Sequence, residues 1–266
     1  MTFDWIVWAG AVTAVAAAAR STWSPCGLSM LSSITPFTER SRGHRYWVTA
    51  TWFVLGALVG GLTLGAGAAL LAKGVSGVGL GSRPVALSIV AAICALGAAA
   101  VDTGVFGDWL PIIRRQVDDG WLSRYRPWFY GAGFGWQIGV GVATYVMTAA
   151  VFLLVVLAAL SARPATAVAL GALFGLARGL TVLLTSRAGS PERLRSLHRR
   201  MAQAGPTVRG SVIAVEIVVA VIALTQEWLI SGIIVGVAAG LGAVAWSVRH
   251  RVSRPALAPS AQVVKS

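Results

Sequence analysis

One cysteine lies in a motif that interrupts a long apolar segment. The sequence Ser24-Pro25-Cys26-Gly27 is followed by a second proline at Pro36. Pro25 has no backbone N–H and its ring clashes with the preceding turn, whereas Gly27 tolerates conformations that other residues avoid. The hydroxyl groups of Ser24 and its neighbours can replace the hydrogen bonds that the broken backbone loses. The motif therefore predicts a thiol at a helix break, where it could exchange disulfides or bind a soft metal ion.

Four charged residues fall within apolar segments, namely Arg20, Asp102, Arg178 and Glu216. A lone charge inside a bilayer is costly, so such residues pair with one another or line a polar cavity. We expect an ion pair between Arg178 and Glu216, because they lie on sequential helices. We expect Arg20 either to pair with Asp102 or to reach the membrane surface. The alternative is that all four line a polar cavity beside Cys26.

The elements that carry these residues are membrane-spanning helices. Of the 266 residues, 56% are hydrophobic and only 12% are charged, and the mean hydropathy is +0.75. A soluble domain carries roughly 25% charged residues. Apolar runs of about 20 residues, long enough to cross a bilayer, recur along the chain. We therefore expect an all-α polytopic membrane protein of seven spans. The expected spans are 4–35, which is broken, 46–72, 84–106, 130–160, 164–186, 208–225 and 228–248.

The distribution of charge predicts the orientation. The net charge is +13, but nearly all the arginines between spans fall on one side of the membrane when the N-terminus is placed outside. This positive-inside pattern indicates a multi-pass protein of the plasma (inner) membrane of a bacterium, with the N-terminus outside and the C-terminus in the cytoplasm. It argues against nucleic acid as a partner and names the lipid bilayer instead. Nothing before Asp4 resembles the basic region of a cleaved signal peptide, so we expect the first span to be retained.

Glycines spaced four residues apart predict close helix packing. They recur at Gly56, Gly60, Gly61 and Gly65 in the second span, at Gly171, Gly175 and Gly179 in the fifth, and at Gly232, Gly236 and Gly240 in the seventh. Small residues at this spacing let neighbouring helices approach closely. We interpret them as packing positions within one bundle rather than as a dimer interface. The oligomeric state is left open.

Two stretches between spans predict helices at the membrane surface. The stretch 108–121 carries an apolar residue every fourth position, and 190–205 has an arginine-rich face that should attract anionic lipid. Gly205 should end the second of these helices. We interpret His44, His198 and His250 as surface residues, because their spacing does not suit a metal site. We expect neither a metal nor a cofactor.

The fourth span has features of the first. When Trp136 is aligned with Trp23, Gly139 falls on Cys26, and Gln137 lies between the aligned positions. Each segment opens a group of three spans, so the two groups would have opposite orientations, as in an inverted repeat with broken helices at the midplane. We expect a single transmembrane domain over 1–250, with repeats at 4–106 and 130–225, an extra span at 228–248 and a disordered cytoplasmic tail at 251–266.

The motif and the span pattern resemble a known family. The string from Ser24 to Met30, the proline at Pro36 and the sequence from Phe53 to Leu58 are similar to the cytochrome c biogenesis transmembrane family, whose members are thiol–disulfide membrane electron carriers. The resemblance implies that the first and fourth spans each bring one cysteine. It implies that such a pair takes electrons from a cytoplasmic thioredoxin-like protein and passes them to an extracytoplasmic thiol protein.

The chain departs from that family at the second cysteine. Gly139 stands where the resemblance places it, and a seventh span exceeds the usual six. The other cysteine, Cys94, lies in an apolar setting in the third span. A relay needs a second thiol within bonding reach, with Cα atoms closer than about 7 Å. Cys94 can serve only if the third span packs against the broken part of the first.

Three functions remain open. The first is a thiol–disulfide oxidoreductase that moves reducing equivalents across the membrane through Cys26. The second is a small-solute or soft-metal transporter on the same scaffold, in which Cys26 and its neighbours bind rather than react. The third is a non-catalytic membrane partner that has kept the scaffold and lost the relay, as the glycine at position 139 suggests.

Overall fold

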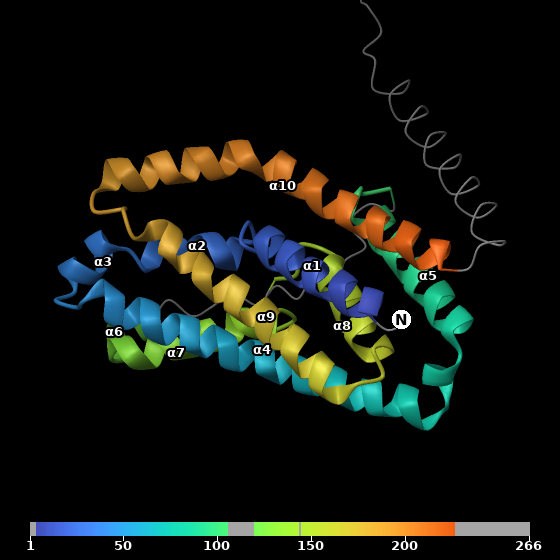
Figure 1. Ribbon diagram of the computed structural model, residues 1–266. Coiled ribbons are helices and arrows are strands. Elements are labelled where there is room, and N and C mark those ends of the chain that lie inside the picture. Colours follow the sequence, from blue (N-terminus) through green and yellow to red (C-terminus); the bar gives the residue numbers. More distant parts are fainter. Residues whose placement is uncertain (1–3, 106–119, 144, 227–266) are drawn as a thin grey trace, which may run out of the picture.

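The computed structural model describes residues 4–105, 120–143 and 145–226, which form helices joined by short connections, without strands (Figure 1). Four helices of this part are long and apolar enough to cross a membrane, which confirms the all-α membrane class. They are α4 (Tyr46–Gly77), α5 (Pro84–Asp102), α9 with the 3-10 turn η2 (Pro164–Leu180 and Thr181–Thr185), and α10 (Pro191–Thr225). Residues 108–119 of the expected surface helix, the seventh span with its glycines, the tail 251–266 and His250 lie outside the described residues.

The first span is broken as the sequence predicts. Helix α1 (Asp4–Ser21) ends before the motif, and α2 (Pro25–Ser33) begins within it. A further short helix, α3 (Pro36–Ser41), follows after Thr35. The Thr22 hydroxyl donates to the carbonyl of Ala18 at 3.1 Å and helps to complete the last turn of α1. Local hydroxyl groups thus replace the bonds that the broken backbone loses.

Prolines set where helices begin. Proline occupies the first turn of α2, α3, α5, α9, α10 and α7 (Pro127–Val140). Its fixed φ suits a helix, and its missing N–H would have no partner at that position. Pro25 therefore starts the second half of the first span as much as it ends the first half.

Helix α4 packs along both α7 and α9; it is the long cyan helix of Figure 1. A Cβ at Gly56 or Gly60 would collide with the backbone of α7, and one at Gly61 or Gly65 would collide with the backbone of α9. The predicted close packing of the second and fifth spans is confirmed. These glycines allow backbone contact because any side chain would force the helices apart.

Helices α1, α5, α8 (Ala150–Leu160) and α10 make up the other side of the bundle. α5 packs on α10, and α1 lies against α8, α9 and α10. Small side chains dominate this core, which contains Ala91 and Ala95 of α5 together with Ala220 and Ala223 of α10. The short elements η1 (Leu80–Ser82) and α6 (Trp121–Arg124) precede α5 and α7.

Helix α10 runs further than expected. Gly205 was expected to separate a surface helix from the sixth span, but the helix continues through Gly205 and Pro206 to Thr225. That expectation is wrong, because membrane helices tolerate proline where a neighbour satisfies the carbonyls near it. Here the Trp23 indole donates to the carbonyl of Met201 at 2.7 Å, one turn before the proline. α10 therefore joins an arginine-rich first half to an apolar second half along one side of the molecule (Figure 1).

Candidate functional site

Cys26 lies in the first turn of α2, and its side chain is buried. Ser24 is the N-cap, and its hydroxyl accepts a hydrogen bond from the Gly27 N–H at 3.0 Å. A Cβ at Gly27 would stand 2.5 Å from the Thr22 carbonyl oxygen, so only glycine fits this close return of the chain. Each residue of the motif thus has a separate part in forming the break, and together they fix the position of the thiol.

The buried guanidinium of Arg178 is near this thiol. Arg178 lies in the last turn of α9, its side chain is 1% exposed, and it interacts electrostatically with Cys26. Its Nη2 donates to the Ser21 carbonyl at 3.3 Å, at the end of α1, where a helix terminus carries partial negative charge. Nε and Nη1 have no hydrogen-bond partner among the described residues. A positive charge with unused donors therefore accompanies the thiol at the break.

The second cysteine lies in a different part of the core. Cys94 packs against the cluster that α5, α8 and α10 form, whereas α2 packs against η2 and α7. Both cysteines are reduced, and no disulfide joins Cys26 to Cys94. The main packing partners of α5 are thus α8 and α10, and those of α2 are η2 and α7.

The expected ion pair between Arg178 and Glu216 does not form. The described residues contain one ion pair, between Arg42 and Glu39, and Glu216 instead interacts electrostatically with Asp102. This expectation is wrong. Two residues on consecutive helices meet only if the helix faces that carry them pack together, and the sequence does not determine those faces. The four intramembrane charges form two groups: Arg178 lies beside Cys26, and Asp102 interacts electrostatically with Arg20 and with Glu216.

Asp102 caps a helix that is distant in sequence. Its carboxylate accepts hydrogen bonds from the Thr148 hydroxyl and from the Ala149 N–H, the latter at 2.8 Å, at the start of α8. The α8 N-cap has no side-chain cap of its own, so Asp102 satisfies donors that would otherwise be orphaned. Arg209 donates to the Asp102 carbonyl at 2.8 Å, and Arg20 interacts with Asp102 electrostatically.

The fourth span is broken, but later than the alignment with the first span predicts. Helix α7 includes Trp136, Gln137 and Gly139 and ends at Val140, and α8 begins only at Ala150. The turn comes at Gly141, whose φ of +75° favours glycine. A Cβ at Gly139 would collide with the Ala57 carbonyl of α4, so this glycine serves helix packing. Gly139 therefore lies within α7, before the break.

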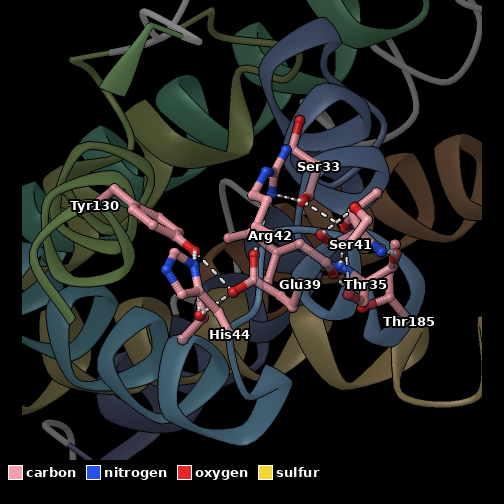
Figure 2. Close-up of polar contacts among 11 residues, drawn as sticks. Ser33, Thr35, Glu39, Ser41, Arg42, His44, Tyr130 and Thr185 are labelled. Carbon is pink, nitrogen blue, oxygen red and sulfur yellow. Dashed lines mark hydrogen bonds and ion pairs between the residues drawn. The ribbon is translucent and has the colours of Figure 1, made fainter. Parts of the chain in front are cut away.

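A buried polar cluster at the arginine-rich end was missed by the sequence reasoning (Figure 2). Glu39 of α3 is fully buried and accepts hydrogen bonds from the hydroxyls of Thr49 and Tyr130, the latter at 2.7 Å. Arg42 pairs with its other oxygen at 3.2 Å, and Nδ1 of His44 lies 3.3 Å from the Tyr130 hydroxyl. The cluster ties α3, α4 and α7 together just after the broken span. His44 is therefore part of a polar network and not a plain surface residue.

Pro36 begins α3 and so helps to place this cluster. Its neighbour Thr35 is the N-cap and forms a reciprocal capping box with Thr38. Arg42 also donates to the Ser33 carbonyl at 3.0 Å, at the end of α2. The signal available in the sequence was the Thr35-Pro36 helix start. That signal places Glu39 in a helix, but it cannot show that the side chain is buried.

A cavity of about 270 Å³ opens between α2 and the first half of α10. The residues that line it are Trp23, Leu28, Ser29, Ser32, His198, Met201 and Ala202. His198 Nε2 lies 3.2 Å from the Ser32 hydroxyl, so this histidine contacts α2. Across the described residues, no group of three or more His, Cys, Asp or Glu side chains is placed to hold a metal ion.

Fold and site together define a helical membrane protein with a buried thiol at a helix break. Among curated proteins, the chain is similar to methylamine utilization protein MauF. It is 34% identical to that of Paracoccus versutus over 168 residues, which cover 61% of this chain and 59% of the relative. It is 32% identical to that of Paracoccus denitrificans over 184 residues, covering 65% and 62%, and 32% identical to that of Methylorubrum extorquens over 171 residues, covering 60% and 56%.

The chain thus spans less than two thirds of the length of these curated relatives. No protein-family model matches the chain. No solved structure gives a significant match either.

Proposed function

We propose that this chain is a membrane accessory protein of amine utilisation in which Cys26 exchanges disulfides with thiol proteins. The context of amine utilisation comes from the names of the curated relatives. The observation that carries the chemistry is the electrostatic interaction of Cys26 with the buried guanidinium of Arg178, whose Nε and Nη1 have no hydrogen-bond partner among the described residues. Inside a membrane a thiolate needs a counter-charge, and Arg178 supplies one at a fixed place.

The exchange has two balanced steps. The Cys26 thiolate attacks one sulfur of a partner's disulfide, forms a mixed disulfide and releases the partner's other sulfur as a thiolate. In the second step a thiol protein with two cysteines attacks the Cys26 sulfur and releases the first partner with both of its thiols reduced; the other thiolate of that protein then displaces Cys26 as a thiolate and closes a disulfide within its own chain. One cysteine suffices for this exchange because partners bring the other sulfurs, so neither Gly139 nor Cys94 is needed as the resolving position.

The scaffold we propose is the 3+3 inverted repeat of the cytochrome c biogenesis transmembrane family. In such a repeat the second span pairs with the fifth and the third with the sixth across the axis. The packing of α4 on α9 and of α5 on α10 supports this arrangement, as do the breaks in both the first and the fourth spans. We also propose the orientation of the positive-inside pattern, with a thioredoxin-like partner in the cytoplasm and a thiol protein outside.

The test is the reaction of the protein in lipid nanodiscs with the disulfide 4,4′-dithiodipyridine, which releases a coloured thiopyridone. We expect Cys94→Ser to react at Cys26. Arg178→Met should slow that reaction about ten- to hundredfold, the factor that corresponds to the roughly 1.5–3 kcal/mol of a charge-assisted contact. Arg178→Lys keeps the charge and should recover part of the rate.

Lys73→Met is the matched control, because Lys73 is an exposed cation on α4. It should leave the rate unchanged. A Cys26 that fails to react in the folded Cys94→Ser protein would refute the proposal. So would a rate that is the same in Arg178→Met and in Lys73→Met.

Transport of a small solute is a second candidate, and one observation favours it. The interior contains polar atoms without partners among the described residues, on Thr13, Ser21, Arg178 and Glu216, near two broken helices. Such groups are typical of a solute site at the midplane of a transporter. Solute flux into proteoliposomes that survives Cys26→Ser would favour transport. Growth on amines that tolerates replacement of both cysteines, without any flux, would favour the non-catalytic partner.

A further inference from the structure

Glu216 is the most isolated ionisable group in the described part of the chain. It lies in the apolar second half of α10, and its side chain is fully buried. Neither of its carboxylate oxygens has a hydrogen-bond partner among the described residues. An ionised carboxylate without a partner in an apolar interior is strongly disfavoured, and binding of a proton removes the charge.

The packing of α1 against α10 places a hydroxyl at the level of Glu216. Ala9 shares a core cluster with Val219, and Ala17 shares another with Val212, so the two helices run antiparallel. Thr13 lies halfway between the two alanines and Glu216 lies between the two valines, so both fall in the same stretch of the packing between α1 and α10. The Thr13 hydroxyl is also buried without a hydrogen-bond partner in the described structure. Among the described residues, the contact between α1 and α10 therefore gives Glu216 no hydrogen bond that would stabilise a carboxylate.

The two buried acidic residues, Glu216 and Asp102, differ in the charged and polar groups around them. Asp102 of α5 interacts electrostatically with Glu216, and a negative Asp102 opposes a second negative charge nearby. Asp102 itself receives the donors at the start of α8 and lies within electrostatic range of Arg20 and Arg209. Glu216 has neither such hydrogen-bond donors nor a neighbouring arginine of this kind. Of the two carboxylates, Glu216 is therefore the one that holds a proton.

Other titratable groups around Glu216 are few. On α5 the remaining one is the Cys94 thiol, which packs against the same cluster. Helix α8 carries none, α1 contributes Arg20 at its end, and α10 contributes Arg209 two turns away.

We propose that Glu216 is a proton-binding site of the membrane domain, held as a carboxylic acid when α1 and α10 are packed together. Separation of these helices would admit water, and Glu216 would then release its proton to water and become a carboxylate. This site is independent of the disulfide exchange at Cys26. It gives the domain a protonation step that depends on the position of α1 against α10.

The test is an infrared measurement at neutral pH on the purified protein in dodecyl maltoside micelles, a detergent that contains no carbonyl group. A protonated carboxylic acid has a C=O stretching band that carboxylates and amides lack. We expect this band in the wild type and its loss in Glu216→Gln, which keeps the size and neutrality of the acid. Glu192→Gln removes an exposed carboxylate from the same helix and should retain the band.

Two results would overturn the proposal. One is a band of equal strength in the wild type and in Glu216→Gln, which would show that Glu216 carries no proton. The other is loss of the wild-type band when sodium replaces choline at constant pH, which would make Glu216 a site for an alkali cation. Failure of disulfide exchange at Cys26 would leave the band unchanged.

Discussion

The hydrogen bonds to the buried carboxylate of Glu39 should contribute measurably to the stability of the protein. Tyr130→Phe removes the hydroxyl that donates to Glu39 at 2.7 Å and keeps the ring that packs in the core around Phe53 and Phe134. Thr49 and Arg42 remain as partners of the carboxylate, so the variant loses one contact of a network and does not leave the charge alone. We therefore expect a folded but less stable protein.

The expected loss follows from the kind of hydrogen bond. A hydrogen bond to a charged group contributes about 1.5–3 kcal/mol, and in a chain of this size each kcal/mol lowers Tm by about 2–4 °C. Tyr130→Phe should therefore lower Tm by about 3–12 °C. Thr49→Val should act through the same carboxylate oxygen, so the double variant should not show the simple sum of the two losses.

The assay is thermal unfolding in detergent, followed by intrinsic tryptophan fluorescence. Tyr125→Phe is the matched control, since this tyrosine belongs to a partly exposed aromatic cluster at the same end of the bundle. It should leave Tm almost unchanged. Equal shifts in Tyr130→Phe and Tyr125→Phe would refute the reasoning, and exact additivity with Thr49→Val would show that the cluster is not one network.

Two further predictions concern packing around the broken span. Gly61→Ala should lower stability by more than the roughly 1–3 kcal/mol of ordinary overpacking, because the new Cβ would meet the backbone of α9. Gly67→Ala should be neutral, because nothing lies within 4 Å of its Cβ. The yield of monodisperse protein in size-exclusion chromatography compares the two variants. Trp23→Phe should lower the free energy of unfolding by about 1 kcal/mol, because it removes the donor to the Met201 carbonyl, about one turn before Pro206. Protease sensitivity of the first half of α10 should rise in that variant and would stay at the wild-type level if the hydrogen bond were irrelevant.

Features of the fold that depend on local sequence were predictable. Ser24-Pro25 and Gly27 determine the helix break within a few residues, because N-capping, proline geometry and a glycine return are all local. The glycines of α4 and α9 likewise predicted close packing, and these two helices do meet through their backbones. Hydropathy predicted the four helices that are long and apolar enough to cross a membrane.

Features that depend on which faces meet were not predictable. Arg178 and Glu216 lie on sequential helices, yet helix rotation directs one toward α2 and the other toward α5. The fourth span continues past Gly139 because its glycines pack on α4, and it breaks only at Gly141. Burial of Glu39 requires Tyr130, which is distant in sequence, so no local pattern could have found it.

The central claim is that Cys26 forms a disulfide with another protein, and trapping that bond in cells tests it most directly. Cells that produce the Cys94→Ala protein are quenched with acid, remaining thiols are alkylated, and the purified protein is analysed by mass spectrometry. We predict a disulfide between Cys26 and a cysteine of a partner protein, and we expect this disulfide-linked product to be absent in Cys26→Ala. Recovery of Cys26 only as the alkylated thiol, under both oxidising and reducing growth conditions, would contradict it.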